Sequence, residues 1–266
     1  MISFTVDLED PTERYDPNGR YVLMTRRILD LCSEFNRRAT FFAVGKLAAS
    51  APQLVKDIAA SGHEIAFHSH AHVSLTDEDP VRFKHETLAD SDRLAQLAGK
   101  KIIGFRAPRF SLTPKSVWAL DILRDLGFRY SSSVMPTSVS LYGFADAPRI
   151  PFRWPNGLIE LPLPVVKGSR MPYLGGIYLY AMPFFITRRT VAQADPGELL
   201  WTYTHPYDFD REEKFAVLAN TPWWVSFVLW HSRRFAQGKI RKLLALGNAP
   251  PLGERIDTLT SLDTYS

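Results

Sequence analysis

The chain has 266 residues, 45% of them hydrophobic, a length that fits one α/β barrel-sized core or two small ones, and we favour one. Lys and Arg exceed Asp and Glu by 32 to 28, and because this small excess is spread along the chain we do not predict nucleic-acid binding. Cys32 is the only cysteine, which excludes an intrachain disulfide and a cysteine zinc site.

The start of the chain is strand-like. It lacks the basic residues, long apolar region and small-residue cleavage site of a secretory signal. No stretch approaches eighteen uninterrupted apolar residues, so we predict no transmembrane helix. On these grounds we expect a cytoplasmic protein.

Strand-like and helix-like patterns alternate along the first half of the chain. After a first apolar run that ends near residue 7, strands are predicted over 39–44, 64–67 and 102–105, and another begins at 128. Helices are predicted between them, over 21–37, 52–61, 79–97 and 115–126. This alternation predicts a parallel sheet or barrel.

The second half gives weaker signals. A strand is predicted over 157–162, the aromatic segment 175–182 is suited to line a cleft, and a late strand over 199–204 ends at His205. A helix over 221–246 carries Trp223, Trp224, Trp230 and a basic stretch from 233 to 242. Such a helix could lie on a membrane or bind an acidic polymer, but more often its aromatic face packs on its own domain and its cations stay in water. We therefore divide the chain into a barrel, 1–215, and a helical extension packed on it, 216–266.

Four of the seven histidines lie between residues 62 and 74. His68 and His72 are four residues apart, so a helical turn or a tight loop would let both imidazoles face one ion. The first strand ends in Asp7, Glu9 and Asp10, and in α/β proteins such strand ends deliver side chains to the edge where sites form. We therefore expect one of these carboxylates to complete a metal site with the two histidines.

Other interpretations of the same residues remain open. Histidines at this density also occur in surface loops or as hydrogen-bonded core residues, and acids after a strand often cap the next helix. The metal interpretation gains weight from two further polar strand ends, at Arg106 and at His205.

In this order the motifs resemble those of the polysaccharide deacetylases, the NodB homology or carbohydrate esterase 4 family. The resemblance covers residues 2–208 and rests on an acidic first strand, His-Ser-x-x-His at 68–72, Arg-x-Pro at 106–108 and a strand ending in His205-Pro. Flanking words such as Gly-His-Glu-Ile at 62–65 and Gly-Gly-Ile-Tyr at 175–178 are most similar to the subgroup of exopolysaccharide and O-antigen loci. Four ordered motifs are a strong signal, whereas any one alone would be weak.

The resemblance implies a distorted (β/α)7-type barrel that hydrolyses N-acetyl groups of sugars with a divalent metal held by one acid and two histidines. Carried over by position, Asp7 corresponds to the general base, Arg106 to the residue that orients it and His205 to the general acid. His68 and His72 correspond to metal ligands. Two histidines with one carboxylate suit zinc, cobalt or nickel alike, and zinc is our first expectation.

The sequence also departs from the family pattern. Residues 5–10 read Thr-Val-Asp-Leu-Glu-Asp, so the metal carboxylate is Glu9 if the acids keep a one-residue spacing and Asp10 if the chain bulges. A family aspartate is replaced by Ser131, and the usual His-Pro-Trp-Glu ends here in Tyr207 and Asp208. These changes put in doubt the charge network behind His205.

The expected function is removal of N-acetyl groups from a bacterial surface polysaccharide or its precursor. Cleaving an amide needs an activated water, a stabilised oxyanion and a proton donor, so Asp7 and His205 are expected in opposite protonation states, with a bell-shaped pH profile. The alternatives are hydrolysis of another C–N bond, in a formamide or ureide, and an inactive barrel that only binds carbohydrate.

Overall fold

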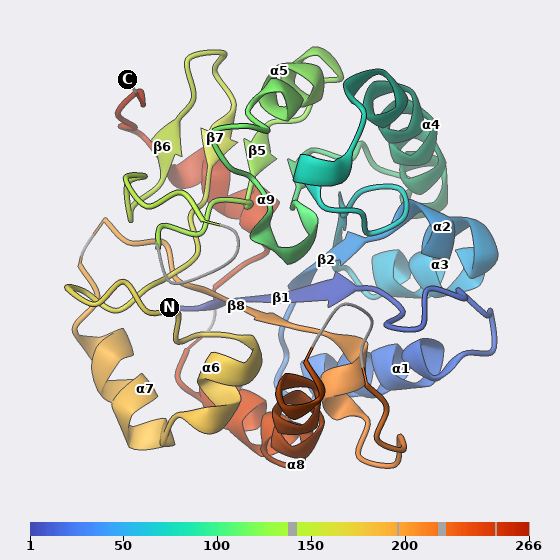
Figure 1. Cartoon of the computed structure of the whole chain (residues 1–266), viewed down its shortest axis with the longest axis vertical. Coiled ribbons are helices and arrows are strands. Elements are labelled where there is room, and N and C mark those ends of the chain that lie inside the picture. The colour runs from blue at the N-terminus through green and yellow to red at the C-terminus, as the bar shows by residue number, and fades with distance from the viewer. Residues whose placement is uncertain (138–142, 196, 218–221, 248, 266) are drawn as a thin grey trace.

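Eight strands form one sheet in the computed structural model of the protein, which describes residues 1–137, 143–195, 197–217, 222–247 and 249–265. They are β1 (Ser3–Leu8), β2 (Ala39–Ala43), β3 (Glu64–Phe67), β4 (Gly104–Phe105), β5 (Tyr130–Ser131), β6 (Phe152–Arg153), β7 (Ile159–Glu160) and β8 (Trp201–Thr204). Their order is β6-β7-β5-β4-β3-β2-β1-β8, and every neighbouring pair is parallel except β6 with β7. This arrangement is a distorted, half-open α/β barrel, as the sequence predicts (Figure 1).

Helices surround this sheet (Figure 1). They are α1 (Arg20–Glu34), α2 (Gly45–Ser50), α3 (Pro52–Ala60), α4 (Pro80–Ala98), α5 (Trp118–Asp125), α6 (Gly176–Ala181), α7 (Phe184–Ala192), α8 (Trp223–Ala245) and α9 (Leu252–Arg255). The helices expected over 21–37, 52–61, 79–97 and 115–126 are confirmed with shifts of a few residues, whereas α2, α6, α7 and α9 were not predicted as helices. The helix expected over 221–246 is α8, and its first expected residue, 221, lies outside the described residues.

The pleat of the strands decides which side chains reach the barrel interior. β1 and β2 pair in regular register along their length, without a bulge. Asp7 therefore shares the interior face with its partner Phe42, and Glu9, two residues further on, leaves the strand toward the same side. On β8 the same alternation carries Tyr203 and then His205 to this face. The regular pleat thus brings the polar ends of both strands to one place.

Apolar side chains fill both faces of the sheet. A large cluster between sheet and helices includes Val6 and Phe41, and a smaller one inside the barrel includes Phe42, Tyr130 and Trp201. All five side chains are fully buried. The site thus rests on a packed interior rather than on a pore.

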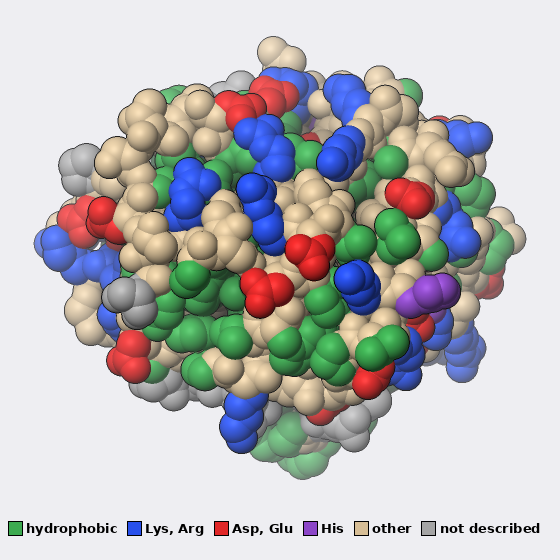
Figure 2. All heavy atoms as spheres, turned by 90° about the horizontal axis from the view of Figure 1, so that it is seen from above, with side chains coloured by type: hydrophobic (Ala, Val, Ile, Leu, Met, Phe, Trp, Pro, Cys, Tyr) green, Lys and Arg blue, Asp and Glu red, His purple; other side chains and the backbone are tan. Residues whose placement is uncertain are grey.

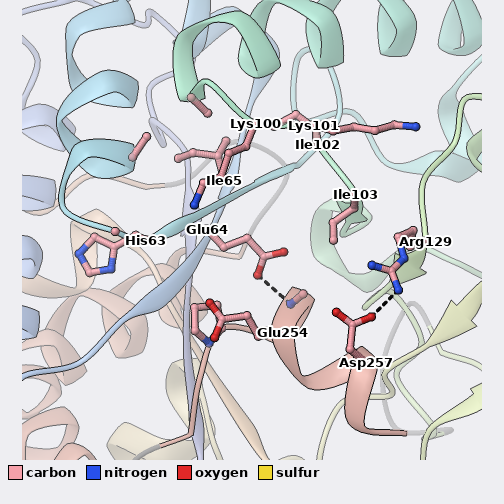
Figure 3. A pocket seen from close by; sticks show the side chains of 15 residues that line it. His63, Glu64, Ile65, Lys100, Lys101, Ile102, Ile103, Arg129, Glu254 and Asp257 are labelled. Atoms are coloured by element: carbon pink, nitrogen blue, oxygen red, sulfur yellow. Dashed lines mark hydrogen bonds and ion pairs between the residues drawn. The ribbon is translucent and has the colours of Figure 1, made fainter. Parts of the chain in front are cut away.

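The amino end of the barrel is closed by α9. The N–H of Gly253 donates to Glu64 Oε2 over 2.9 Å, and Tyr130 Oη donates to Glu64 Oε1 over 3.0 Å. Burial raises the pKa of Glu64, against the hydrogen bonds it accepts. A pocket of about 260 Å³ lies beside this contact (Figure 3). The proposed boundary at residue 215 stays a prediction, with Leu252 beyond it packed inside the barrel.

The expected orientation of α8 is wrong for its first three turns. There Ser226, Ser232 and Arg233 are buried, whereas Trp223 and Trp224 are 67% and 59% exposed. No helix in the described part of the chain is long and apolar enough to cross a bilayer. On the face seen in Figure 2, acidic and basic side chains are interspersed, in line with the spread of charge along the sequence.

Candidate metal and catalytic site

The three carboxylates at the end of β1 take different directions. Asp7 and Glu9 are buried on the interior face, 4% and 6% exposed. Asp10 instead accepts hydrogen bonds from the N–H and hydroxyl of Thr12, at 3.0 and 2.9 Å, and from the N–H of Tyr15 at 2.9 Å. Its carboxylate therefore closes the loop after the strand and does not enter the histidine cluster described below.

The two predicted histidine ligands lie on a tight loop after β3. Nδ1 of His68 lies 2.8 Å from the carbonyl oxygen of Arg106, and because a carbonyl only accepts, Nδ1 carries the proton and Nε2 keeps its lone pair. Ser69 and His72 have φ of 64° and 58°, which excludes a helical turn. The ring centroids of His68 and His72 are 5.2 Å apart. Of the two local structures that this spacing allowed, the loop is correct.

Helices α2 and α4 fix this loop. The N–H of Gly45 donates to the carbonyl of Ser69 over 2.9 Å, and His70 Nδ1 lies 2.7 Å from the buried carboxylate of Asp90. A Cβ on Gly45 would lie 1.9 Å from that carboxylate, so only glycine fits where α2 begins. His70 thus points away from the other histidines and ties the loop to α4.

Replacing His70 by Ala is expected to weaken zinc binding about tenfold and to lower the free energy of unfolding by about 1–3 kcal/mol. The variant leaves the Asp90 carboxylate short of a partner and frees the loop that orients the ligands. Zinc titration calorimetry and thermal unfolding measure the two effects. His85→Ala removes an exposed histidine from α4 and is the matched control. Equal zinc affinity in both variants would contradict the positioning role of His70.

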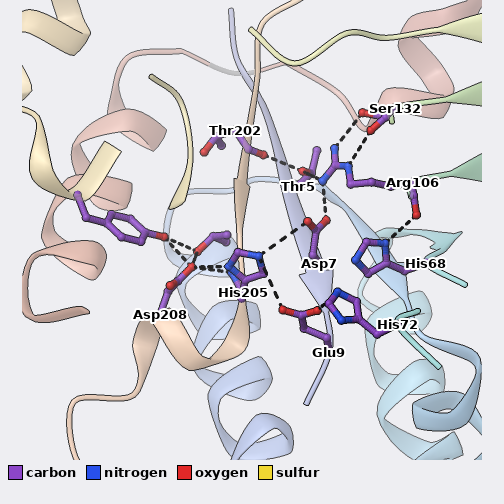
Figure 4. A network of polar contacts seen from close by, with 12 residues as sticks. Thr5, Asp7, Glu9, His68, His72, Arg106, Ser132, Thr202, His205 and Asp208 are labelled. Atoms are coloured by element: carbon purple, nitrogen blue, oxygen red, sulfur yellow. Dashed lines mark hydrogen bonds and ion pairs between the residues drawn. The ribbon is translucent and has the colours of Figure 1, made fainter. Parts of the chain in front are cut away.

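Glu9, His68 and His72 converge at the carboxyl ends of the strands (Figure 4). One ligand atom from each lies within 4.8 Å of the other two. Oε2 of Glu9 is buried, contacts Nε2 of His72 and lacks a hydrogen-bond partner. Burial lowers the pKa of His68 to about 4, so its imidazole is neutral at pH 7. A buried carboxylate oxygen without a donor, turned toward imidazole nitrogens, fits a divalent cation that accepts these lone pairs.

Charge is concentrated around Glu9. Burial alone raises the pKa of Glu9, but the contact with His72 and the charge of His205 outweigh it and hold the pKa well below its ordinary value. The Glu9 carboxylate is therefore ionised at neutral pH. An ionised acid beside a neutral imidazole is the protonation state that metal binding requires.

Arg106 binds Asp7 inside the barrel, beside the cluster. Its guanidinium is fully buried and donates to Asp7 Oδ1 over 2.5 Å, to Thr5 Oγ1 over 2.8 Å and to Ser132 Oγ over 3.1 Å. It also lies over the ring of Phe42, 3.9 Å from the centroid. Burial lowers the pKa of Arg106, opposed by the charge of Asp7, and the guanidinium stays charged. The same residue therefore orients Asp7 with its side chain and His68 with its carbonyl.

His205 faces the cluster from the end of β8. Its Nε2 lies 3.9 Å from carboxylate oxygens of both Asp7 and Glu9, and its Nδ1 lies 3.0 Å from Asp208 Oδ2. The ring of Tyr207 stacks on the imidazole, with centroids 4.6 Å apart and planes at 7°. Burial alone lowers the pKa of His205, but the charge of Asp208, followed by those of Glu9 and Asp7, raises it to about 9. His205 is therefore protonated at pH 7.

The partner of His205 comes from its own motif, residues 205–208, in which Asp208 replaces the usual glutamate. Asp208 accepts hydrogen bonds from the Tyr180 hydroxyl over 2.8 Å and from the N–H of His205 over 2.8 Å. Ser131, at the position of the family aspartate, bonds instead to the hydroxyl of Ser133. A carboxylate three residues after the histidine thus supplies the charge behind His205.

The cleft between these groups measures about 320 Å³. Sequence reasoning missed several residues that support or line it, namely Thr5, Ser132, Tyr180, Arg109, Leu229 and Arg233. Only Tyr180 stood in a segment expected to line a cleft. Thr5 and Arg109 stand in or beside quoted motifs, but no role was assigned to them, because their roles depend on neighbours brought close by the fold. Leu229 and Arg233 come from a helix far along the chain.

Fold and site together define an α/β barrel with a candidate two-histidine, one-carboxylate metal site, beside which Asp7 and His205 lie close together. Residues 15–131 match the family model "Polysaccharide deacetylase", and residues 132–248 match a model described as a domain of unknown function, DUF3473. Over residues 15–131 the chain is therefore similar to polysaccharide deacetylases. The subgroup of exopolysaccharide and O-antigen loci stays a prediction.

Two curated relatives carry deacetylase names. The chain is 29% identical over 106 residues to a chitooligosaccharide deacetylase of a Bradyrhizobium species, a match of 40% of this chain and 46% of the relative. It is 33% identical over 97 residues to a peptidoglycan-N-acetylglucosamine deacetylase of Bacillus cereus, which covers 36% of this chain and 33% of the relative. The chain thus matches less than half of the length of either relative.

A solved structure extends the likeness of the fold to the whole chain. This Mycobacterium smegmatis protein, assigned to the polysaccharide deacetylases, superposes with a TM-score of 0.65 at 21% identity. The superposition covers 100% of this chain and 93% of that one. At this identity the likeness concerns the fold alone, but it extends over the whole chain, whereas the two curated relatives match 40% and 36% of it.

Proposed function

We propose that the protein is a metal-dependent hydrolase that removes N-acetyl groups from sugars of a bacterial surface polysaccharide, an O-antigen or exopolysaccharide, or of its precursor. One observation carries the proposal: Asp7, held by Arg106, and His205, held by Asp208, lie beside the Glu9 cluster, with His205 Nε2 3.9 Å from Asp7 Oδ2. Such a pair of oppositely charged groups is what acid–base cleavage of an amide needs.

Glu9, His68 and His72 would hold the metal, with zinc as the first expectation and cobalt or nickel fitting the same donors. When bound, the cation would acidify a water molecule and polarise the acetyl carbonyl. We assign the carboxylate ligand to Glu9 because Asp10 is engaged by Thr12 and Tyr15.

The residues of the chain supply the proton transfers. Asp7 accepts a proton from the water that attacks the acetyl carbon, and Arg106 keeps its carboxylate aimed at the cleft. His205 carries a proton at pH 7 and donates it from Nε2 to the sugar nitrogen as the C–N bond breaks. Asp208 keeps Nδ1 of His205 occupied, so that Nε2 is the nitrogen that faces the cleft.

Asp7→Asn is expected to reduce acetate release from an N-acetylated glycan by a hundredfold or more, because proton transfer contributes about 10²–10⁴-fold to such rates. A coupled acetate assay on chitooligosaccharides and peptidoglycan fragments measures it. Asp57→Asn, on a partly exposed side chain of α3, is the matched control. Turnover of a formamide or ureide without acetate would support the rival C–N hydrolase, and glycan binding without any turnover would support an inactive barrel.

Neither alternative is favoured. Both curated relatives described above are named deacetylases, and each member of the proposed acid–base machinery has its partner in place. We also propose peripheral membrane contact for the C-terminal helix, supported by the aromatic side of α8 rather than by its basic stretch.

A further inference from the structure

In the first three turns of α8 polar side chains face the protein and apolar side chains face outward, the reverse of an ordinary surface helix. The side of the helix that faces the protein buries Ser226, Ser232 and Arg233. The opposite side exposes large apolar residues at helical spacing. A surface helix normally places its apolar side against the core, so this outward apolar side lacks the environment that it would ordinarily have.

The adjoining segment enlarges this apolar surface. Phe215 packs against Phe227 and Trp230, with ring centroids 5.9 and 5.7 Å apart, and Val217 is 56% exposed. We call the whole surface the docking face. Its exposed members are Phe215, Val217, Trp223, Trp224, Phe227 and Val228. Contiguous exposed apolar surfaces of this kind mark interaction sites.

Three cations of the basic stretch of α8, Arg233, Lys239 and Arg241, contact other parts of the protein, whereas Arg234 is exposed. Arg233 pairs with Glu213, and Arg241 pairs with Glu34. Lys239 Nζ donates to the carbonyl oxygens of Leu179 and Tyr180, over 3.2 and 2.7 Å. These contacts fix α8 to α6 and α1, which flank it in Figure 1, and leave its aromatic side outward.

Unpaired cations flank the docking face. Arg211 donates to the backbone carbonyl of Arg234, which places both beside the exposed turns of α8, and Lys214 precedes Phe215. All three cations are exposed, and within the described residues none of them has an ion pair, whereas the neighbouring acids Glu212 and Glu213 are paired with arginines. The face therefore combines aromatic side chains with net positive charge.

We propose that the docking face binds an anionic lipid surface. Tryptophan suits the boundary between water and lipid because its ring is apolar while its N–H can stay hydrated, and the flanking cations match anionic headgroups. Pairing of two copies through the same face would bring the three unpaired cations of each copy into one interface, where like charges repel. A sugar platform would not use the aliphatic members Val217 and Val228.

The docking face and the cleft lie on opposite sides of α8. Leu229 and Arg233, on the inner side of the same turns, line the cleft. Docking would therefore bring the cleft to glycan carried at a lipid surface, a consequence that rests on the proposed deacetylation. The substrate class this implies is a lipid-linked or membrane-bound N-acetylated glycan.

Co-sedimentation of the full chain with phosphatidylcholine vesicles, with and without phosphatidylglycerol, tests the proposal. The protein is expected to bind the vesicles that contain phosphatidylglycerol. The double variant Trp223→Ser/Trp224→Ser is expected to bind them at least about tenfold more weakly. Arg211→Gln/Lys214→Gln/Arg234→Gln is expected to remove the preference for phosphatidylglycerol. Phe185→Ser, which changes a 70% exposed aromatic residue on α7, is the matched control and should bind as the parent does.

Three outcomes would overturn the docking face as a lipid-binding surface. These are no vesicle binding by the parent, equal binding by the double tryptophan variant, or a dimer or glycan complex that only this variant loses. Acetate release from a soluble N-acetylated oligosaccharide, measured on the same preparations, tests the cleft separately. Vesicle binding without acetate release would contradict the deacetylase proposal alone. Acetate release without vesicle binding would contradict the docking proposal alone.

Discussion

Glu9→Gln is expected to lower zinc affinity a hundredfold or more, whereas Asp10→Asn is expected to retain zinc. Residues behind metal ligands typically contribute about 10–100-fold to affinity, so an anionic ligand should contribute at least the upper end of that range. The two variants are isosteric and remove one charge each from adjacent positions. They therefore separate the two acids that sequence reasoning left open.

Asp10→Asn is expected to act on stability instead. Its carboxylate accepts hydrogen bonds from Thr12 and Tyr15, and an amide can replace only part of these, at a cost of about 1–2 kcal/mol in the free energy of unfolding. Elemental analysis after dialysis, zinc titration calorimetry and urea unfolding give the three readouts. Zinc lost from Asp10→Asn but kept by Glu9→Gln would reverse the assignment.

The ambiguity between these acids shows what the sequence could not decide. Period-two alternation places Asp7 and Glu9 on one side only if β1 has no bulge, and a bulge is a property of the pairing with β2. The regular register settles this, and the loop bonds of Asp10 confirm that the strand geometry ends before it.

The strand ends that carry the candidate site were predictable because each follows a run of buried residues. Asp7, His68, Arg106 and His205 all stand at or just beyond the ends of strands. Strand β6, Phe152–Arg153, was not predicted, because two residues are too few for any periodicity to be seen. The first residue of α2 must be a glycine, Gly45, because the carboxylate of Asp90 lies against it. No local sequence pattern reveals this contact.

Helix α8 is the opposite case, in which a local pattern pointed the wrong way. Its tryptophans were predicted to form the buried side, because aromatic residues usually pack against the core of the protein. Arg233 occupies the inner side instead, paired with Glu213 and 5.1 Å from the ring centroid of Tyr207. That ring stacks on His205, so the inner side of α8 is polar because it supports the site.

The charge behind His205 determines the second large effect that we expect. Asp208 is the main group that raises the pKa of His205, to about 9. Burial alone would raise the pKa of Asp208, but His205 lowers it, so the two groups stabilise each other's charged forms. A general acid is active below its pKa, and the rate should therefore fall as the pH rises through the pKa of His205.

Asp208→Asn is expected to lower acetate release a hundredfold or more at neutral pH and to move the basic limb of the pH profile to lower pH by about one unit or more. Without the carboxylate, burial lowers the pKa of His205, and less of the imidazole carries the proton that the leaving amine needs. Nδ1 also loses its fixed acceptor, so the ring samples orientations in which Nε2 no longer faces the cleft.

Asp210→Asn provides the control for this prediction. It removes a carboxylate from the same loop, one that pairs with Arg20 and does not contact His205. Rate profiles of kcat and of kcat/KM, recorded with the metal content verified, should shift for Asp208→Asn alone. If both variants keep the parental basic limb, the proton donor is a group other than His205, and the carboxylate of Asp208 then serves only to anchor the turn after β8, through the N–H of His205 and the hydroxyl of Tyr180.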